Sequence, residues 1–287
     1  MLDARIHEAI VHEAINGTTA AKPPRKRTRK VQLPDLVYYP ETDGEPMADS
    51  DYQYDAMVDG KFALVNYYAH DPTVYVAANM FVYHVKGDPS KNIAPDIFVV
   101  HDVDNRKRSS YKVWQEGRLP SIVFEVASPG TFAKDLLKKS RYLALRIPEY
   151  IMLDPTNGEF FGEAIQGFRL AQDKQGEYEY VAISKLTHED ASLLAGLYSE
   201  QLGLEIWAKR GPINDAPAIF RFRNPKTGEW LLSQREGELD RLNAHQHAEQ
   251  QTRQAEQERQ ARLAAEAEVA RLRELLEKMN NQTGNPE

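Results

Sequence analysis

Short apolar runs separated by turn residues occupy the middle of the chain. The run 121–127 is nearly continuous in β-forming residues and contains one charged residue, Glu125, which is typical of a strand buried on both faces. Residues 132–146 then place apolar side chains at helical spacing, and 149–154 form a second apolar run that Pro155 ends. Strand, helix and strand within about 35 residues predict a right-handed crossover in a mixed sheet.

Helix and strand patterns also flank this unit. A helix is predicted over 51–69, because Met57, Leu64 and Tyr68 lie roughly on one helical face. With the runs of β-branched and aromatic residues that follow it, the core is predicted to be α/β. The further expected elements are strands at 74–78, 80–85 and 97–100, a short amphipathic piece at 111–114, and two shorter antiparallel strands near Phe160 and at 178–183.

The C-terminal part of the chain has a different composition. Residues 234–278 are rich in Glu, Gln, Arg and Ala, lack proline and contain a single glycine, Gly237. They predict a long helix over 233–279, followed by a disordered end at 280–287. A solvent-exposed single helix and a coiled coil between two copies both remain open, because only the last two heptads carry an apolar seam. The seam residues are Val269, Leu272, Leu276 and Met279.

Charge is distributed unevenly. The chain has 287 residues and a net charge of −7, but residues 1–30 carry +4 and residues 31–230 carry −8. Six basic residues lie within 22–30, beside two prolines, so 1–32 is predicted to be a flexible basic arm. It could be a solvated linker, a segment that contacts phosphate, or a targeting signal in a host with a nucleus. The acidic middle argues against a strong non-specific nucleic-acid binder, although it leaves room for one locally basic face.

Several classes of protein are excluded by composition. The chain has no cysteine, which excludes disulfides, thiolate metal sites and a cysteine nucleophile. No apolar run approaches the roughly 20 residues that cross a bilayer. The first residues contain acids where a signal peptide would be basic and apolar. We therefore expect a soluble, cytoplasmic protein without a membrane partner.

Two acids lie within or beside predicted strands. Asp96 follows Pro95 and opens the run 97–100, and Glu125 lies in the middle of its own strand. An ionised carboxylate in an apolar strand is costly unless it is paired or binds a metal. Each acid taken singly could be solvated at a strand end. Together, on neighbouring strands, they predict a shared site for a hard cation such as Mg²⁺.

Charged residues also occupy the helix that follows the Glu125 strand. Asp135, Lys138 and Lys139 lie near one helical face, and helical side chains lean toward the N-terminus, so a lysine there can reach back to the strand. A surface ion pair is the ordinary alternative. Two carboxylates, a metal and a lysine are the groups that phosphodiester hydrolysis requires.

These segments resemble a known family. The motifs are APDIFVV, YKVWQEGRLPSIVFEVASPGT, the SRY of the following helix and IPEYIMLDP. They are similar to the Uma-type restriction-endonuclease-like proteins of the PD-(D/E)XK nuclease superfamily. The segment YYPETDGEPMADSDYQYDAMV resembles members that carry a long Glu/Gln/Arg-rich helix at the C-terminus. The resemblance implies a mixed β-sheet core flanked by helices over 33–232, with DNA as the substrate.

The resemblance also assigns roles to residues. It implies Asp96 and Glu125 as the two catalytic acids and metal ligands, the carbonyl of Val126 as a third metal contact, and Mg²⁺ or Mn²⁺ as the cofactor. Ala127 stands where the superfamily normally has its lysine, and this group is thought to supply the lysine from the following helix. Lys138 and Lys139 both fit that role, depending on how the helix is aligned.

Two functions follow from this reading. The first is a metal-dependent DNA endonuclease. The second is a nuclease-like fold that has lost catalysis and acts as an oligomeric assembly or nucleic-acid-binding module, which Ala127 and the acidic core favour. A homo-oligomer could form through the C-terminal helix in either case.

Overall fold

The computed structural model describes residues 37–42, 44, 48, 50–130, 132–211 and 217–283. These residues belong almost entirely to the second of two compact units, Tyr38–Glu287. The predicted basic arm at 1–32 and the last residues of the predicted disordered end, 284–287, lie outside them. The elements are α2 (Asp51–Tyr67), β1 (Val74–Ala78), β2 (Val82–Tyr83), β3 (Asn92–Ile93), β4 (Ile97–His101), β5 (Tyr111–Lys112), α3 (Val113–Glu116), β6 (Ile122–Val126), α4 (Phe132–Ala144), β7 (Glu149–Leu153), β8 (Ile165–Gln172), β9 (Tyr178–Ala182), β10 (Lys185–Leu186), β11 (Leu193–Ser199), β12 (Leu204–Lys209), β13 (Ile219–Arg223) and α5 (Gln234–Thr283).

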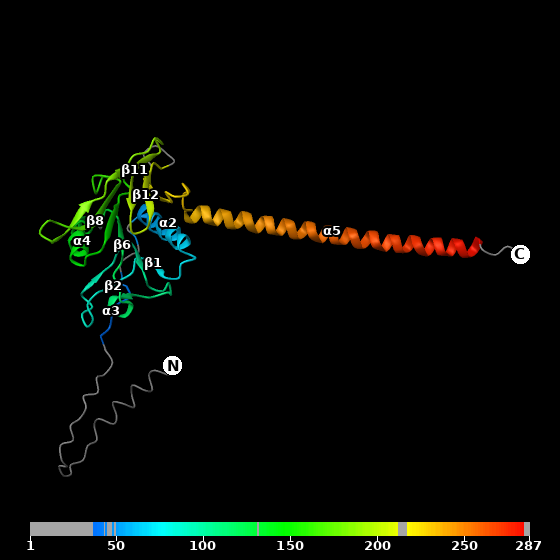
Figure 1. Cartoon of the computed structure of the whole chain (residues 1–287), viewed down its shortest axis with the longest axis horizontal. Helices are drawn as coiled ribbons and strands as arrows, with labels where there is room; N and C mark the ends of the chain where they lie inside the picture. The colour runs from blue at the N-terminus through cyan, green and yellow to red at the C-terminus, as the bar shows by residue number, and fades with distance from the viewer. Residues whose placement is uncertain are drawn as a thin grey trace, which may run out of the picture. The chain divides into compact units, whose positions relative to one another are not determined.

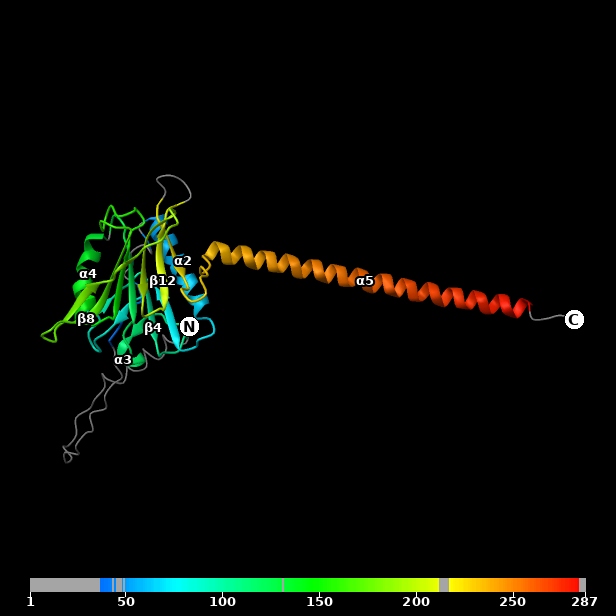
Figure 2. The same ribbon diagram turned by 45° about the horizontal axis from the view of Figure 1, so that its top comes forward.

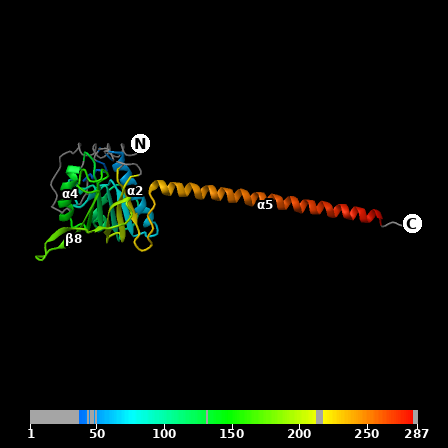
Figure 3. The same ribbon diagram turned by 90° about the horizontal axis from the view of Figure 1, so that it is seen from above.

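A six-stranded mixed sheet forms the centre of the fold. Its order is β1-β4-β6-β7-β8-β9, in which β6 and β7 are parallel and all other neighbours are antiparallel. The unit β6-α4-β7 is therefore the strand-helix-strand connection that the sequence predicts. Every residue of β6 and β7 is buried, because both faces of the sheet are covered. In all three ribbon views α4 and α2 lie on opposite sides of these strands (Figures 1, 2 and 3).

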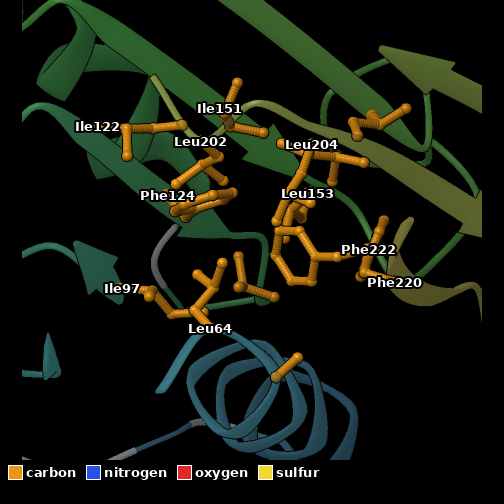
Figure 4. Close-up of a cluster of buried hydrophobic side chains, with 14 of the residues drawn as sticks. Leu64, Ile97, Ile122, Phe124, Ile151, Leu153, Leu202, Leu204, Phe220 and Phe222 are labelled. Atoms are coloured by element: carbon orange, nitrogen blue, oxygen red, sulfur yellow. The ribbon is translucent and has the colours of Figure 1, made fainter. Parts of the chain in front are cut away.

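One face of the sheet packs against α2 and a second, four-stranded sheet of order β10-β11-β12-β13. Leu64 of α2 and Phe222 of β13 meet Phe124 of the central strand in one apolar cluster (Figure 4). Burial of such side chains contributes on the order of 1.5–3 kcal/mol each. This layer holds α2 firmly against the central strands.

The opposite face packs against α4 and a small three-stranded sheet of order β3-β2-β5. Tyr142 of α4 is fully buried there beside Tyr150 of β7, with ring centroids 5.2 Å apart. Glu125 belongs to this face, because side chains alternate along a strand and its neighbours Phe124 and Val126 point into the first layer. The α4 layer therefore covers the predicted site.

Two details of the predicted strands are wrong. Residues near Phe160 form turns instead of a strand, because Asp154 accepts hydrogen bonds from the backbone N–H groups of Phe160 and Phe161, each at 2.8 Å. The strand begins later, at Ile165. The expected strand at 80–85 is reduced to β2 and lies outside the central sheet.

The long helix α5 begins with a capping box. The Glu236 carboxylate accepts from the Ser233 N–H at 2.8 Å, and the Ser233 hydroxyl accepts from the Glu236 N–H at 3.3 Å. Arg221 of β13 donates to both carboxylate oxygens of Glu236, at 3.1 and 2.8 Å. The first turn of α5 is therefore bound to the four-stranded sheet.

The close approach of α2 explains why α5 has a glycine at position 237. A Cβ atom at that position would lie 2.5 Å from Cζ of Phe62 in α2, so only glycine allows the two helices to approach this closely. Asp59 of α2 also accepts the Gln234 N–H at 2.9 Å. Side chains from 238 to 279 are exposed, and the helix ends at Thr283, beyond the predicted end at 279. Within the described part of the chain, no helix is both long and apolar enough to cross a membrane.

Candidate active site

The two predicted acids lie side by side at adjacent strand ends. Continuing the β4–β6 register by one step places Asp96 opposite Glu125. Directly opposed residues of antiparallel strands point to the same face, with Cβ atoms about 4.5–5.5 Å apart. Asp96, a partly exposed residue, accepts the Val126 N–H through its carboxylate at 2.7 Å. Asp96 thus lies beside Glu125, the acid with which the strand pattern predicts it to share a site, and beside Val126, which the family resemblance adds.

Glu125 is fully buried, and both of its carboxylate oxygens accept hydrogen bonds. Lys138 donates to Oε2 at 2.6 Å, and the hydroxyl of Tyr142 donates to Oε1 through a short bond. Burial raises the pKa of Tyr142 well above its ordinary value, and the Glu125 charge raises it further, so the phenol stays a proton donor. Two side chains of α4 thus contact the buried Glu125 carboxylate.

The two candidate lysines point to different places. The Lys138 side chain is 23% exposed and reaches from the surface to the buried Glu125. Lys139 instead places its ammonium 3.4 Å from the centroid of the Phe168 ring in β8. Burial lowers the pKa of Lys139. The side chain of Asp135, the third charged residue predicted on this helix face, lies outside the described part of the chain.

Sequence reasoning missed one polar residue at the site. Gln53, in the first turn of α2, is 3% exposed, and its side-chain amide donates to the Val126 carbonyl at 3.3 Å. A signal was present in the sequence. Gln53 precedes Met57, Gly60 and Leu64 by 4, 7 and 11 residues, so it is a polar residue on the buried face of its helix.

Two other buried acids have structural roles. Glu149 binds Arg169 at 2.9 and 3.0 Å, and also accepts from the Ser199 hydroxyl and from the backbone of the turn after β11. Asp154 accepts four hydrogen bonds within the turn that follows β7. Burial of an acid alone therefore does not identify the site in this fold.

The donor set at Asp96 and Glu125 fits a hard divalent cation. Two carboxylates and one backbone carbonyl are the oxygen ligands that Mg²⁺ accepts while keeping several waters. No group of three or more His, Cys, Asp or Glu side chains that could hold a metal occurs among the described residues, so a cage made only of protein ligands is not part of this region.

Comparison with known families agrees with this geometry. The Uma2 family, described as "Putative restriction endonuclease", matches residues 62–204. The chain belongs to the Uma2 family. The matched range contains both acids and the whole β6-α4-β7 unit, whereas Gln53 and α5 lie outside it. Membership of Uma2 makes the chain one of a group of nuclease-like proteins related to the PD-(D/E)XK superfamily.

A solved structure from Anabaena variabilis ATCC 29413, described as a "putative nuclease belonging to DUF820", is also similar to this chain. It is 13% identical, the similarity covers 48% of this chain and 73% of that chain, and the TM-score is 0.33. No curated protein matches the chain.

Proposed function

We propose that this protein is a metal-dependent DNA endonuclease that uses Mg²⁺ or Mn²⁺. The observation that carries the proposal is that Asp96 and Glu125, at the ends of two adjacent central strands, converge with Lys138 of α4. Membership of Uma2 supports nuclease chemistry and DNA as the substrate. The structural acids Glu149 and Asp154 lack this combination of a second, partly exposed acid and a lysine.

The residues have distinct roles in this proposal. Asp96, Glu125 and the carbonyl of Val126 would hold the cation, which activates water and neutralises charge on the scissile phosphate when bound. Tyr142 keeps the buried Glu125 carboxylate in one orientation by donating to its inner oxygen.

Lys138 is the residue that we assign to the phosphate. Its ammonium lies at the border between Glu125 and solvent, where it can donate a hydrogen bond to a non-bridging phosphate oxygen. A cation in that position stabilises the negative charge of the pentavalent transition state. Lys139 is engaged with Phe168 and takes no part.

The alternative, a nuclease-like fold without catalysis, was favoured by Ala127. Ala127 is 3% exposed and offers no charge. A lysine is nevertheless present at the site, because Lys138 reaches Glu125 from the next helix. This position supports retained catalysis over a degenerate fold.

Self-association through α5 is a further part of the proposal. Large apolar side chains on its C-terminal half are about half exposed, with relative exposures from 48% to 63%. Pairing with a second copy would remove this surface from water. Because the seam is short, we expect concentration-dependent association. The exposed residues are those of the seam, Val269, Leu272, Leu276 and Met279, together with Leu263 and Leu275.

Nicking of supercoiled plasmid by the purified chain tests the endonuclease function. We expect cleavage with Mg²⁺ or Mn²⁺, none with chelator, and loss of cleavage in Asp96→Asn and Glu125→Gln. Asp102→Asn is the matched control, because Asp102 follows the same strand β4 at its other end and its side chain is 70% exposed. Cleavage that persists unchanged in Asp96→Asn, or no cleavage by the wild type with any of these metals, would refute the proposal.

A further inference from the structure

Pro95 leaves the backbone of Val126 without its next partner in the sheet. Extending the β4–β6 register places Pro95 opposite Val126. The Asp96 carbonyl points toward β1 and accepts the Asn79 N–H at 3.0 Å. Because successive residues of a strand direct their backbone groups to opposite sides, the backbone of Pro95 faces β6. Proline has no N–H to donate. The Val126 carbonyl therefore cannot receive the bond that any other residue at position 95 could supply.

Two side chains replace the missing backbone partner. The Asp96 carboxylate accepts the Val126 N–H at 2.7 Å, and the Gln53 amide donates to the Val126 carbonyl at 3.3 Å. The other side of the strand is regular, since the next N–H, that of Ala127, donates to Leu153 at 2.8 Å. A buried backbone group needs such partners, because an unpaired one costs about 1–3 kcal/mol.

The Gln53 amide is held in place by its helix. Its backbone N–H donates to the Ser50 hydroxyl, which caps α2, and its side chain is almost fully buried. The next residues on the same helical face, Met57, Gly60 and Leu64, are also buried. The amide therefore approaches the Val126 carbonyl from a rigid element.

We infer that Gln53 is a positioning residue that fixes the Val126 carbonyl for cation binding. A carbonyl oxygen has two lone pairs. Gln53 engages one and leaves the other for the cation. The same peptide unit is held at its other end by the Ala127 N–H, which donates to the Leu153 carbonyl at 2.8 Å. This inference rests on the proposed metal site and extends it to α2, outside the segment that matches Uma2.

A matched control separates positioning from general stability. Gln166 of β8 also donates its side-chain amide to a backbone carbonyl, that of Phe161, at 2.6 Å. Gln166→Met therefore removes the same type of hydrogen bond from a turn that contributes nothing to the cation site. Gln53→Met removes it at Val126, and Gln53→Asn keeps a buried amide that is too short to reach.

Calorimetric titration of the full chain with Mn²⁺ alone tests the inference. We expect Gln53→Met and Gln53→Asn to raise the Mn²⁺ dissociation constant about 10-fold, the lower limit for loss of an outer-shell partner. Gln166→Met should bind Mn²⁺ as the wild type does. Thermal unfolding of each variant establishes that the titrated protein is folded. If Gln53→Met does not fold, Gln53→Asn provides the test.

The possible results are separable. Equal Mn²⁺ affinity in the folded Gln53 variants and the wild type would overturn the inference while leaving the metal site intact. An equal loss of affinity in Gln166→Met would also overturn it, because the effect would then be one of stability. No Mn²⁺ binding by the wild type would instead refute the metal site itself.

Discussion

The two lysines of α4 give the sharpest prediction about the site, because they are adjacent in sequence and differ in what they contact. We consider replacing each by methionine, which keeps most of the length of the side chain and removes its charge. Lys138→Met leaves the fully buried Glu125 carboxylate with Tyr142 and without its ammonium partner at 2.6 Å. Lys139→Met removes a cation from the Phe168 ring and puts an apolar side chain in its place.

The magnitudes differ clearly. Removing one partner of a fully buried ion pair costs about 3–5 kcal/mol. Because Lys138 is 23% exposed and Tyr142 still donates to Glu125, we reduce this to about 2–3 kcal/mol. Loss of a partly exposed cation–π contact costs about 0.5–1 kcal/mol, and methionine packing on the ring offsets part of it.

Urea unfolding at neutral pH without metal measures the difference. Tryptophan fluorescence is the appropriate signal, because Trp114, Trp207 and Trp230 all precede α5, whereas circular dichroism would include the long helix. We also expect Lys138→Met to reduce plasmid cleavage about 10²–10³-fold, the usual cost of removing one charge-stabilising donor. Lys139→Met should cleave within about threefold of the wild type. Equal stability losses, or a larger cleavage defect in Lys139→Met, would refute the assignment of Lys138.

Three further predictions concern the rest of the chain. The Arg108 hydrogen bond holds the pKa of Glu116 below its usual range, so this pair stabilises the fold fully above about pH 5 and loses that contribution as the pH falls through the lowered pKa. Arg108→Met should therefore make the free energy of unfolding depend less on pH in acid, and an unchanged dependence would contradict this. Gly196→Ala places a Cβ against the Trp207 ring and should cost about 1–3 kcal/mol in denaturant unfolding, with no cost meaning that the ring moves freely. Truncation after Asn243 keeps the first turns of α5 and should leave the domain folded but weaken self-association, whereas identical sedimentation of both forms would show that α5 does not mediate it.

The central part of the fold could be predicted from sequence because its signals are local. β6 and β7 are continuous apolar runs, and α4 shows its period between them, so the parallel pair follows from short segments alone. The family resemblance was confirmed as well.

The four-stranded sheet was not predicted, although β13 alternates buried with more exposed residues, and β11 shows why. β11 has two buried positions side by side and a register shift near Ala195, and so it shows neither strict alternation nor a continuous buried run. β8 was displaced from its expected position by the Asp154 turn, which depends on backbone groups six and seven residues away.

Some residues of the candidate site could likewise be predicted from sequence and others could not. Asp96 and Glu125 stand out because a charge inside an apolar strand is costly. The choice between Lys138 and Lys139 could not be made, because adjacent helical residues differ by about 100° around the axis and a one-residue error in alignment exchanges them. Gln53 was missed because its partner, the Val126 carbonyl, lies 73 residues away in sequence.

The most direct test of the account is anomalous diffraction from crystals of the full chain grown with Mn²⁺. We predict one strong peak within coordination distance of the Asp96 and Glu125 carboxylates and the Val126 carbonyl, with the Gln53 amide still on that carbonyl. A structure at the same Mn²⁺ concentration without a peak there, or with the metal bound elsewhere, would contradict the proposed active site.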